Sequence, residues 1–152
     1  MAIDTNLLLL FVVGVTNKNY IQLHKRLNAF FDGDYELLLK AIRGYKAIVL
    51  TPNVVSETSN LIRMTSEPRS SEIANRFEVL IKNTPEVYIS SASASSRREH
   101  ARLGITDCGL IELSAEGAHI LTTDYDLFHA VSACGFTAVN FNHLREAAAR
   151  AR

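Results

Sequence analysis

Five short apolar runs constrain the fold of this chain more than any other feature of its sequence. Each run has the length and composition of a buried strand. The segments between the runs carry apolar residues at three- and four-residue steps, which is typical of helices that bury one face. Strands that alternate with helices predict an α/β fold with a parallel sheet covered by helices on both faces. The expected strands are Ala2 to Asp4, Ala47 to Thr51, Val87 to Ser90, His119 to Thr122 and Thr137 to Phe141.

Length and composition favour a single domain over residues 1–152. A chain of 152 residues is close to the most common domain size, and its 47% hydrophobic and 21% charged residues are ordinary for a globular protein. Sixteen basic residues balance sixteen acidic ones. Any binding of phosphate groups must therefore be local, because no overall charge attracts them.

The apolar run Leu7 to Val15 predicts a buried helix. It follows Asp4 instead of a basic segment, and it is far shorter than the roughly 20 residues that span a bilayer. We therefore expect neither a signal peptide nor contact with a membrane. Cys108 and Cys134 match no paired metal-ligand spacing. We expect both to be free, buried thiols, which favours the reducing cytoplasm.

Two acidic residues stand at the ends of expected strands. Asp4 closes the first strand and Asp124 follows the fourth. Ligands of open parallel sheets bind beside the carboxyl ends of the strands. If these two strands are neighbours, both carboxylates face one crevice.

Two further acids lie on expected helices. Glu57 falls at the edge of the apolar stripe of a helix that is predicted to begin at Thr51-Pro52, with a capping hydroxyl and a proline at the first helical position. Asp107 is expected to open a helix from Cys108 to Glu116. Both acids can reach the crevice, so four carboxylates from four segments are predicted to converge.

Clustered carboxylates are typical of sites for Mg²⁺ or Mn²⁺, which prefer oxygen ligands. Without a metal, like charges so close would raise one another's pKa. Taken singly, each of the four acids also suits a turn, a helix cap or a solvated face; the joint pattern predicts the site. Asp126 is a possible further ligand or a first-turn acid favoured by the helix dipole.

Two polar residues are candidates for supporting roles. Asn6 would either hydrogen-bond Asp4 and hold its rotamer or serve as a simple cap or turn residue. Thr123 would orient a water or phosphate beside Asp124, or it is an ordinary residue at a strand end.

Four motifs, taken in order, resemble the PIN-domain family of ribonucleases: Ala2-Ile-Asp-Thr-Asn6, Thr51-Pro-Asn-Val-Val-Ser-Glu57, Leu103-Gly-Ile-Thr-Asp107 and Leu121-Thr-Thr-Asp124. The resemblance implies a three-layer α/β/α sandwich with a five-stranded parallel sheet in the order 3-2-1-4-5. It also implies Mg²⁺- or Mn²⁺-dependent cleavage of RNA, with Asp4, Glu57, Asp107 and Asp124 as the acidic quartet. Small stand-alone members resemble VapC-type toxins of toxin–antitoxin pairs, which implies a small antitoxin partner and a homodimer.

In the expected mechanism, Asp4, Asp107 and Asp124 hold one metal, and Glu57 assists directly or holds a second metal or its water. The metal activates a water that attacks the phosphodiester in line. Segment 17–46 has room for two helices and is variable in the family, so it leaves the RNA target open. Cations that would guide RNA phosphates are Lys18, Lys25, Arg26, Arg97, Arg98 and Arg102.

Other functional classes fit the sequence less well. A signalling receiver domain would need adjacent acids after the first strand and a lysine that ends the fifth, and both are missing. A phosphatase built on Asp124 and Asp126 would need more chain after them. Two alternatives stay open: an RNA-processing nuclease without an antitoxin, and a PIN fold that binds RNA or protein without cleaving.

Overall fold

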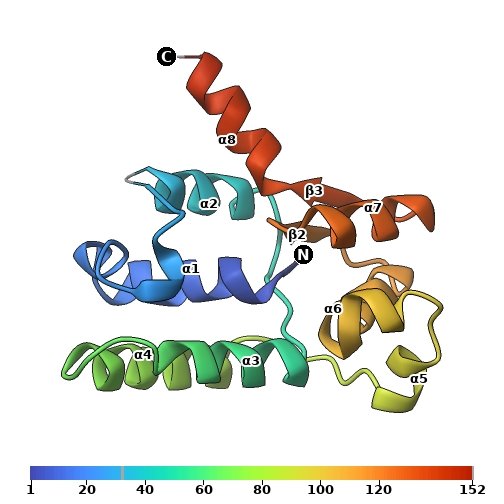
Figure 1. The fold of residues 1–152 in the computed structure, drawn as a ribbon, viewed down its shortest axis with the longest axis horizontal. Coiled ribbons are helices and arrows are strands. Elements are labelled where there is room, and N and C mark those ends of the chain that lie inside the picture. The colour runs from blue at the N-terminus through green and yellow to red at the C-terminus, as the bar shows by residue number, and fades with distance from the viewer. Residues whose placement is uncertain (32, 152) are drawn as a thin grey trace.

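Figure 1 shows a largely helical chain with a small sheet near one end of its first helix. The structure is a computed structural model that describes residues 1–31 and 33–151. The described elements are β1 (Ala2–Ile3), α1 (Thr5–Thr16), the 3₁₀ turns η1 (Lys18–Tyr20) and η2 (Lys25–Leu27), α2 (Asp34–Ile42), α3 (Pro52–Ile62), α4 (Arg69–Asn83), α5 (Ser91–Ser95), α6 (His100–Ala115), β2 (Ile120–Thr122), α7 (Tyr125–Ala133), β3 (Ala138–Asn140) and α8 (Phe141–Arg150).

Helix α1 forms the centre of the molecule. It packs against α2 on one side and against α3 and α4 on the other (Figure 1). Contact on several sides explains why its apolar run is nearly continuous, with Leu7 to Leu10 all fully buried. The buried helix predicted for this run is therefore confirmed. Within residues 1–31 and 33–151, none of the helices combines the length and apolarity needed to cross a bilayer.

Close packing of α1 requires a glycine at position 14. A Cβ atom added there would lie 2.3 Å from the ring of Tyr35 on α2, which is closer than any van der Waals contact. The ring of Tyr35 therefore fills the space that a larger residue would occupy, and α2 can approach the backbone of α1.

The sheet corrects the predicted fold class. In the described residues it has three parallel strands in the order β1-β2-β3, so the five-stranded sheet with the order 3-2-1-4-5 is wrong. The first, fourth and fifth expected strands form, in shortened versions. The other two expected strands, Ala47 to Thr51 and Val87 to Ser90, do not form. Single parallel bridges join Val49 to Ala2 and Leu50 to Glu86.

Local chemistry explains why these two segments stop at single bridges. Leu50 donates its N–H to the carbonyl of Pro85 and accepts from the N–H of Val87. The chain then leaves the pairing direction, because the Thr51 hydroxyl caps α3 by accepting from the N–H of Val54 at 3.4 Å. On the partner segment, Pro85 has no N–H to donate. The helix start predicted at Thr51-Pro52 is confirmed, and this start is what cuts the strand short.

Helix α6 contains a break that positions Asp107. Gly104 has φ of +81°, a left-handed value that favours glycine, and the helix resumes directly after it. Asp107 therefore lies within the first turn of the resumed helix, one turn after Gly104, and does not merely precede a helix that begins at Cys108. A carboxylate in a first turn is stabilised by the helix dipole.

Candidate functional site

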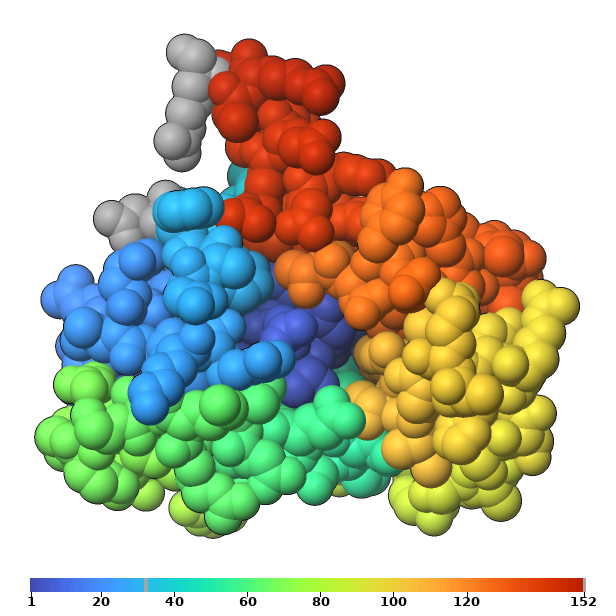
Figure 2. All heavy atoms as spheres, viewed as in Figure 1, coloured from blue at the N-terminus to red at the C-terminus, as the bar shows by residue number. Residues whose placement is uncertain are grey.

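The four predicted acids lie on segments that meet on one face of the molecule. In Figure 2 the dark blue start of the chain is visible between the teal start of α3, the gold of α6 and the orange of α7. These segments carry Asp4, Glu57, Asp107 and Asp124, which are called the acid site below.

Asp4 is the buried member of the acid site. It follows β1 and caps α1, with Oδ1 accepting from the N–H of Leu7 at 2.8 Å. Its Oδ2 accepts from the Thr122 hydroxyl at 2.6 Å, the Thr123 N–H at 2.7 Å and the Thr123 hydroxyl at 3.2 Å. Burial raises the pKa of Asp4, while these hydrogen bonds oppose the rise because they favour the charged form. The carboxylate is thus held rigidly by four donors.

Asp124 is tied to Asp4 through Thr122. Strands β1 and β2 are neighbours, with Ile3 paired to Leu121, so Asp4 and Asp124 lie just beyond the carboxyl ends of adjacent strands. The Thr122 hydroxyl donates to Asp4 and accepts from the N–H of Asp124 at 2.8 Å. Asp124 Oδ1 caps α7 by accepting from the N–H of Leu127 at 2.9 Å. In residues 1–31 and 33–151, no hydrogen bond engages its Oδ2, and the residue is exposed.

Asp107 carries the strongest electrostatic signal in the site. Its pKa is raised from 3.8 to about 7, first by burial and then by the negative charges of Asp124, Asp4 and Glu57. A like charge has such an effect only when it is near. The four acids therefore share one electrostatic environment.

Glu57 is held by two threonine hydroxyls. Thr5 donates to Oε2 at 2.9 Å and Thr106 donates to Oε1 at 2.5 Å. Thr5 directly follows Asp4, and Thr106 directly precedes Asp107. The contacts connect the starts of α1 and resumed α6 to α3, so the orientation of Glu57 depends on the segments that carry two other acids.

Thr5, Thr106 and Thr122 were not among the predicted site residues. The one signal in the sequence is that Thr5 and Thr106 stand next to an acid of the site. Thr122 has no comparable signal, because its role depends on the pairing of β1 with β2.

Three residues given secondary roles lie as follows. Thr123 holds Asp4, and its carbonyl accepts from the side-chain amide of Asn142 at 3.0 Å. Asn6 makes no hydrogen bond to Asp4 within the described part of the chain, and it lines a hollow of about 260 Å³ beside Glu57. Asp126 forms an ion pair with Arg102 at 2.7 Å.

No closed metal cage is present in residues 1–31 and 33–151, because no group of three or more His, Cys, Asp or Glu side chains is arranged to hold an ion. The acid site nevertheless offers only hard oxygen donors, which suit Mg²⁺ or Mn²⁺. Mg²⁺ usually binds one or two carboxylates directly and keeps several waters. The donor set therefore fits an open site of this kind.

Most of the candidate cations are engaged with acids. Lys18 pairs with Glu36, and Arg97 pairs with Glu99 and with Glu112, the latter at 2.6 Å. Arg98 and Arg102 also pair with acids. Arg26, on η2, instead lines the hollow beside Glu57 together with Asn6 and Asn60. Arg26 is thus a candidate cation at the edge of the acid site, on the side of Glu57.

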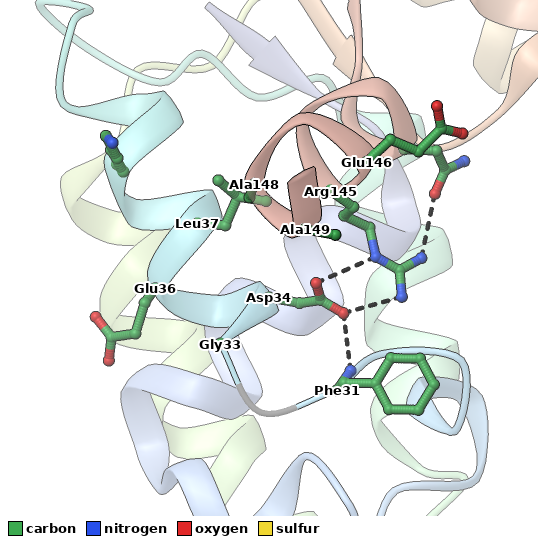
Figure 3. Close-up of a pocket in the computed structure, with 11 residues that line it drawn as sticks. Phe31, Gly33, Asp34, Glu36, Leu37, Arg145, Glu146, Ala148 and Ala149 are labelled. Atoms are coloured by element: carbon green, nitrogen blue, oxygen red, sulfur yellow. Dashed lines mark hydrogen bonds and ion pairs between the residues drawn. The ribbon is translucent and has the colours of Figure 1, made fainter. Parts of the chain in front are cut away.

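A larger hollow of about 870 Å³ lies away from the acids, between α2 and α8 (Figure 3). Arg145 crosses it: its guanidinium contacts both carboxylate oxygens of Asp34 at 3.1 Å, the carbonyl of Ala29 and the amide oxygen of Asn142. Phe31 lines the hollow and is 67% exposed. None of the four acids lines this hollow.

Comparisons with models of known protein families, with curated proteins and with solved structures found no match to this chain.

Proposed function

We propose that this protein is a Mg²⁺- or Mn²⁺-dependent ribonuclease that cleaves phosphodiester bonds at the acid site. One observation carries the proposal: burial, and after it the charges of Asp124, Asp4 and Glu57, raise the pKa of Asp107 to about 7. A bound cation would stabilise the charged form of Asp107, because it offsets the negative charge of the three neighbouring acids. The resemblance to the PIN-domain motifs supports RNA as the substrate.

In this proposal the role of each residue follows from its contacts in the structure. Asp4, which is fixed by four donors, would hold the ion together with Asp107 and Asp124, directly or through its water molecules, and Glu57 is oriented by its two threonines. When bound, the ion would supply a water of lowered pKa and positive charge opposite the phosphate. Arg26 attracts a phosphate of the RNA on the side of Glu57, since a guanidinium matches phosphate oxygens.

The test is cleavage of a labelled RNA by the purified protein with Mn²⁺ and with EDTA. We expect cleavage only with Mn²⁺ and complete loss in Asp4→Asn. The matched control is Glu78→Gln, an exposed carboxylate on α4 that pairs with Lys82, and it should cleave normally. Cleavage by Asp4→Asn at the normal rate contradicts the proposal. RNA binding without cleavage under all conditions supports instead a binding module that does not cleave.

Metal binding gives a readout independent of cleavage. Calorimetric titration of Mn²⁺ into the protein should show a binding event that Asp107→Asn weakens at least tenfold and Glu78→Gln leaves unchanged. Binding of equal strength in Asp107→Asn removes this residue from the metal site.

We further propose that the protein is the toxin of a toxin–antitoxin pair, a homodimer that acts in the cytoplasm. The partner helix would lie in the hollow between α2 and α8, where Phe31 exposes an aromatic ring. Induced expression in a bacterial host should arrest growth through Asp4, and co-expression of the neighbouring small reading frame should relieve the arrest. Normal growth with active enzyme supports the alternative, an RNA-processing nuclease without an antitoxin.

A further inference from the structure

A patch of four rings lies on the surface of α7 and the start of α8. Tyr125 meets the ring of His129 edge-on at 4.3 Å between centroids, and Phe128 meets His143 edge-on at 5.6 Å. Tyr125 also contacts Phe128 and His143, at 6.2 and 6.3 Å. These four residues are called the ring patch below. Tyr125 is 59% exposed, so a large part of its surface faces solvent.

The core of the protein does not account for the ring patch. Helix α7 buries Leu127, Ala130 and Val131, which lie on its inner face. Tyr125, His129 and His143 are exposed, and Phe128 is only partly covered. The rings thus support one another at the surface and leave aromatic faces available to a ligand.

The ring patch begins one residue from the acid site. Tyr125 directly follows Asp124, whose carboxylate caps α7. The start of α8 is joined to the same region, because the side-chain amide of Asn142 donates to the carbonyl of Thr123. Asp126, in the first turn of α7, is paired with Arg102 of α6. An RNA strand cleaved at the acid site would therefore meet aromatic rings close to the cut, because Tyr125 and Asp124 are adjacent at the start of α7.

We propose that the ring patch stacks an unpaired base of the RNA next to the cleaved bond, with Tyr125 as its main platform. The proposal rests on the ribonuclease function proposed above. Aromatic side chains recognise single-stranded nucleic acid by stacking, because every base has a π-face. In a duplex these faces are already stacked inside the helix and are hidden from the protein. The ring patch therefore selects unpaired RNA with little preference for base identity.

The test measures binding without cleavage. In EDTA, the affinity for a short labelled single-stranded RNA should fall about tenfold or more in Tyr125→Ala and stay near normal in Tyr125→Trp, the range that stacking of one base typically supplies. Tyr88→Ala is the matched control, because Tyr88 is 76% exposed and none of the ring contacts recorded for the described residues involves it. A second series uses RNAs that each lack one base. The wild type should bind one of these RNAs as weakly as Tyr125→Ala binds the intact RNA, and Tyr125→Ala should bind that same RNA no more weakly than the wild type does.

The outcomes separate the two proposals. Unchanged RNA affinity in Tyr125→Ala overturns the ring patch as a stacking site, and so does failure of the wild type to bind single-stranded RNA. If Tyr125→Ala instead changes the mass of the protein in light scattering while RNA affinity is unaltered, the patch is a contact between protein chains. Loss of affinity in Tyr125→Ala, with normal Mn²⁺ binding, supports stacking. If such a loss is seen but no RNA is ever cleaved, the nuclease proposal fails, stacking beside a cleaved bond fails with it, and the ring patch is a base-binding site of a protein that binds RNA without cleaving it.

Discussion

Replacing Asp107 by asparagine should stabilise the metal-free protein at neutral and higher pH. The pKa of Asp107 in the folded protein is about 7, against 3.8 for an ordinary aspartate side chain, which represents the unfolded chain. Below pH 4 both folded and unfolded chains carry the proton, and above about pH 7 neither does. Between these limits the folded chain binds more protons, so the stability of the wild type falls as pH rises. About three pH units at 1.36 kcal/mol each give an upper limit of about 4 kcal/mol.

The expected gain from Asp107→Asn is therefore about 2–4 kcal/mol at pH 8, because solvent screens part of this half-buried charge. Urea unfolding in EDTA at pH 4 and pH 8 measures it as the difference between variant and wild type. The gain should be near zero at pH 4. Glu78→Gln, which removes an exposed carboxylate, should show no comparable gain at pH 8. Added Mn²⁺ should stabilise the wild type and not the variant. A variant that is less stable than the wild type at pH 8 refutes the electrostatic argument.

Three further substitutions test the packing and the polar contacts. Gly14→Ala should lower the free energy of unfolding by about 1–3 kcal/mol, measured in urea, because the new Cβ overlaps the ring of Tyr35. Thr106→Val removes one of the two hydroxyls that hold the glutamate of the acid site, so calorimetry should show Mn²⁺ binding about tenfold weaker, with recovery in Thr106→Ser. Arg145→Met should cost about 1–3 kcal/mol in thermal or urea unfolding, because it removes the ion-pair partner of Asp34, whose carboxylate keeps the hydrogen bond from the N–H of Phe31.

The strands that could be predicted from the sequence are those that lie together in the sheet. The runs that became β1 and β2 are apolar and fully buried, and the run that became β3 is partly buried, so burial in the sheet leaves a pattern in the sequence. The run Ala47 to Thr51 has the same composition, yet it pairs at single positions. Only Leu50 and Thr51 of this run are buried, so its apolar composition indicated neither full burial nor pairing. Whether a ladder forms depends on the helix cap at Thr51 and the missing N–H of Pro85, which are local effects that outweigh the pattern.

The acids of the site were easier to predict than the groups that hold them. Asp4 and Asp124 follow strand ends, so their positions depend only on recognising the strands. The contacts of Glu57 join residues 52 and 49 positions apart in the sequence. Such contacts depend on how three helices pack against one another, and the periodicity of a single segment does not predict this packing. The ion pair of Arg102 with Asp126 was missed for the same reason.

Helix α1 couples the integrity of the acid site to the stability of the whole fold. Asp4 caps this helix, and the N–H of Leu7 that its carboxylate accepts belongs to a residue with no exposed surface. We expect exchange of that amide with deuterated solvent to require separation of the surrounding helices, and so to be among the slowest in the protein. Asp4 therefore has no local route out of position, whereas a residue in a surface loop does. In a denaturant series, loss of activity should coincide with loss of helix content, and no inactive folded form should accumulate between them.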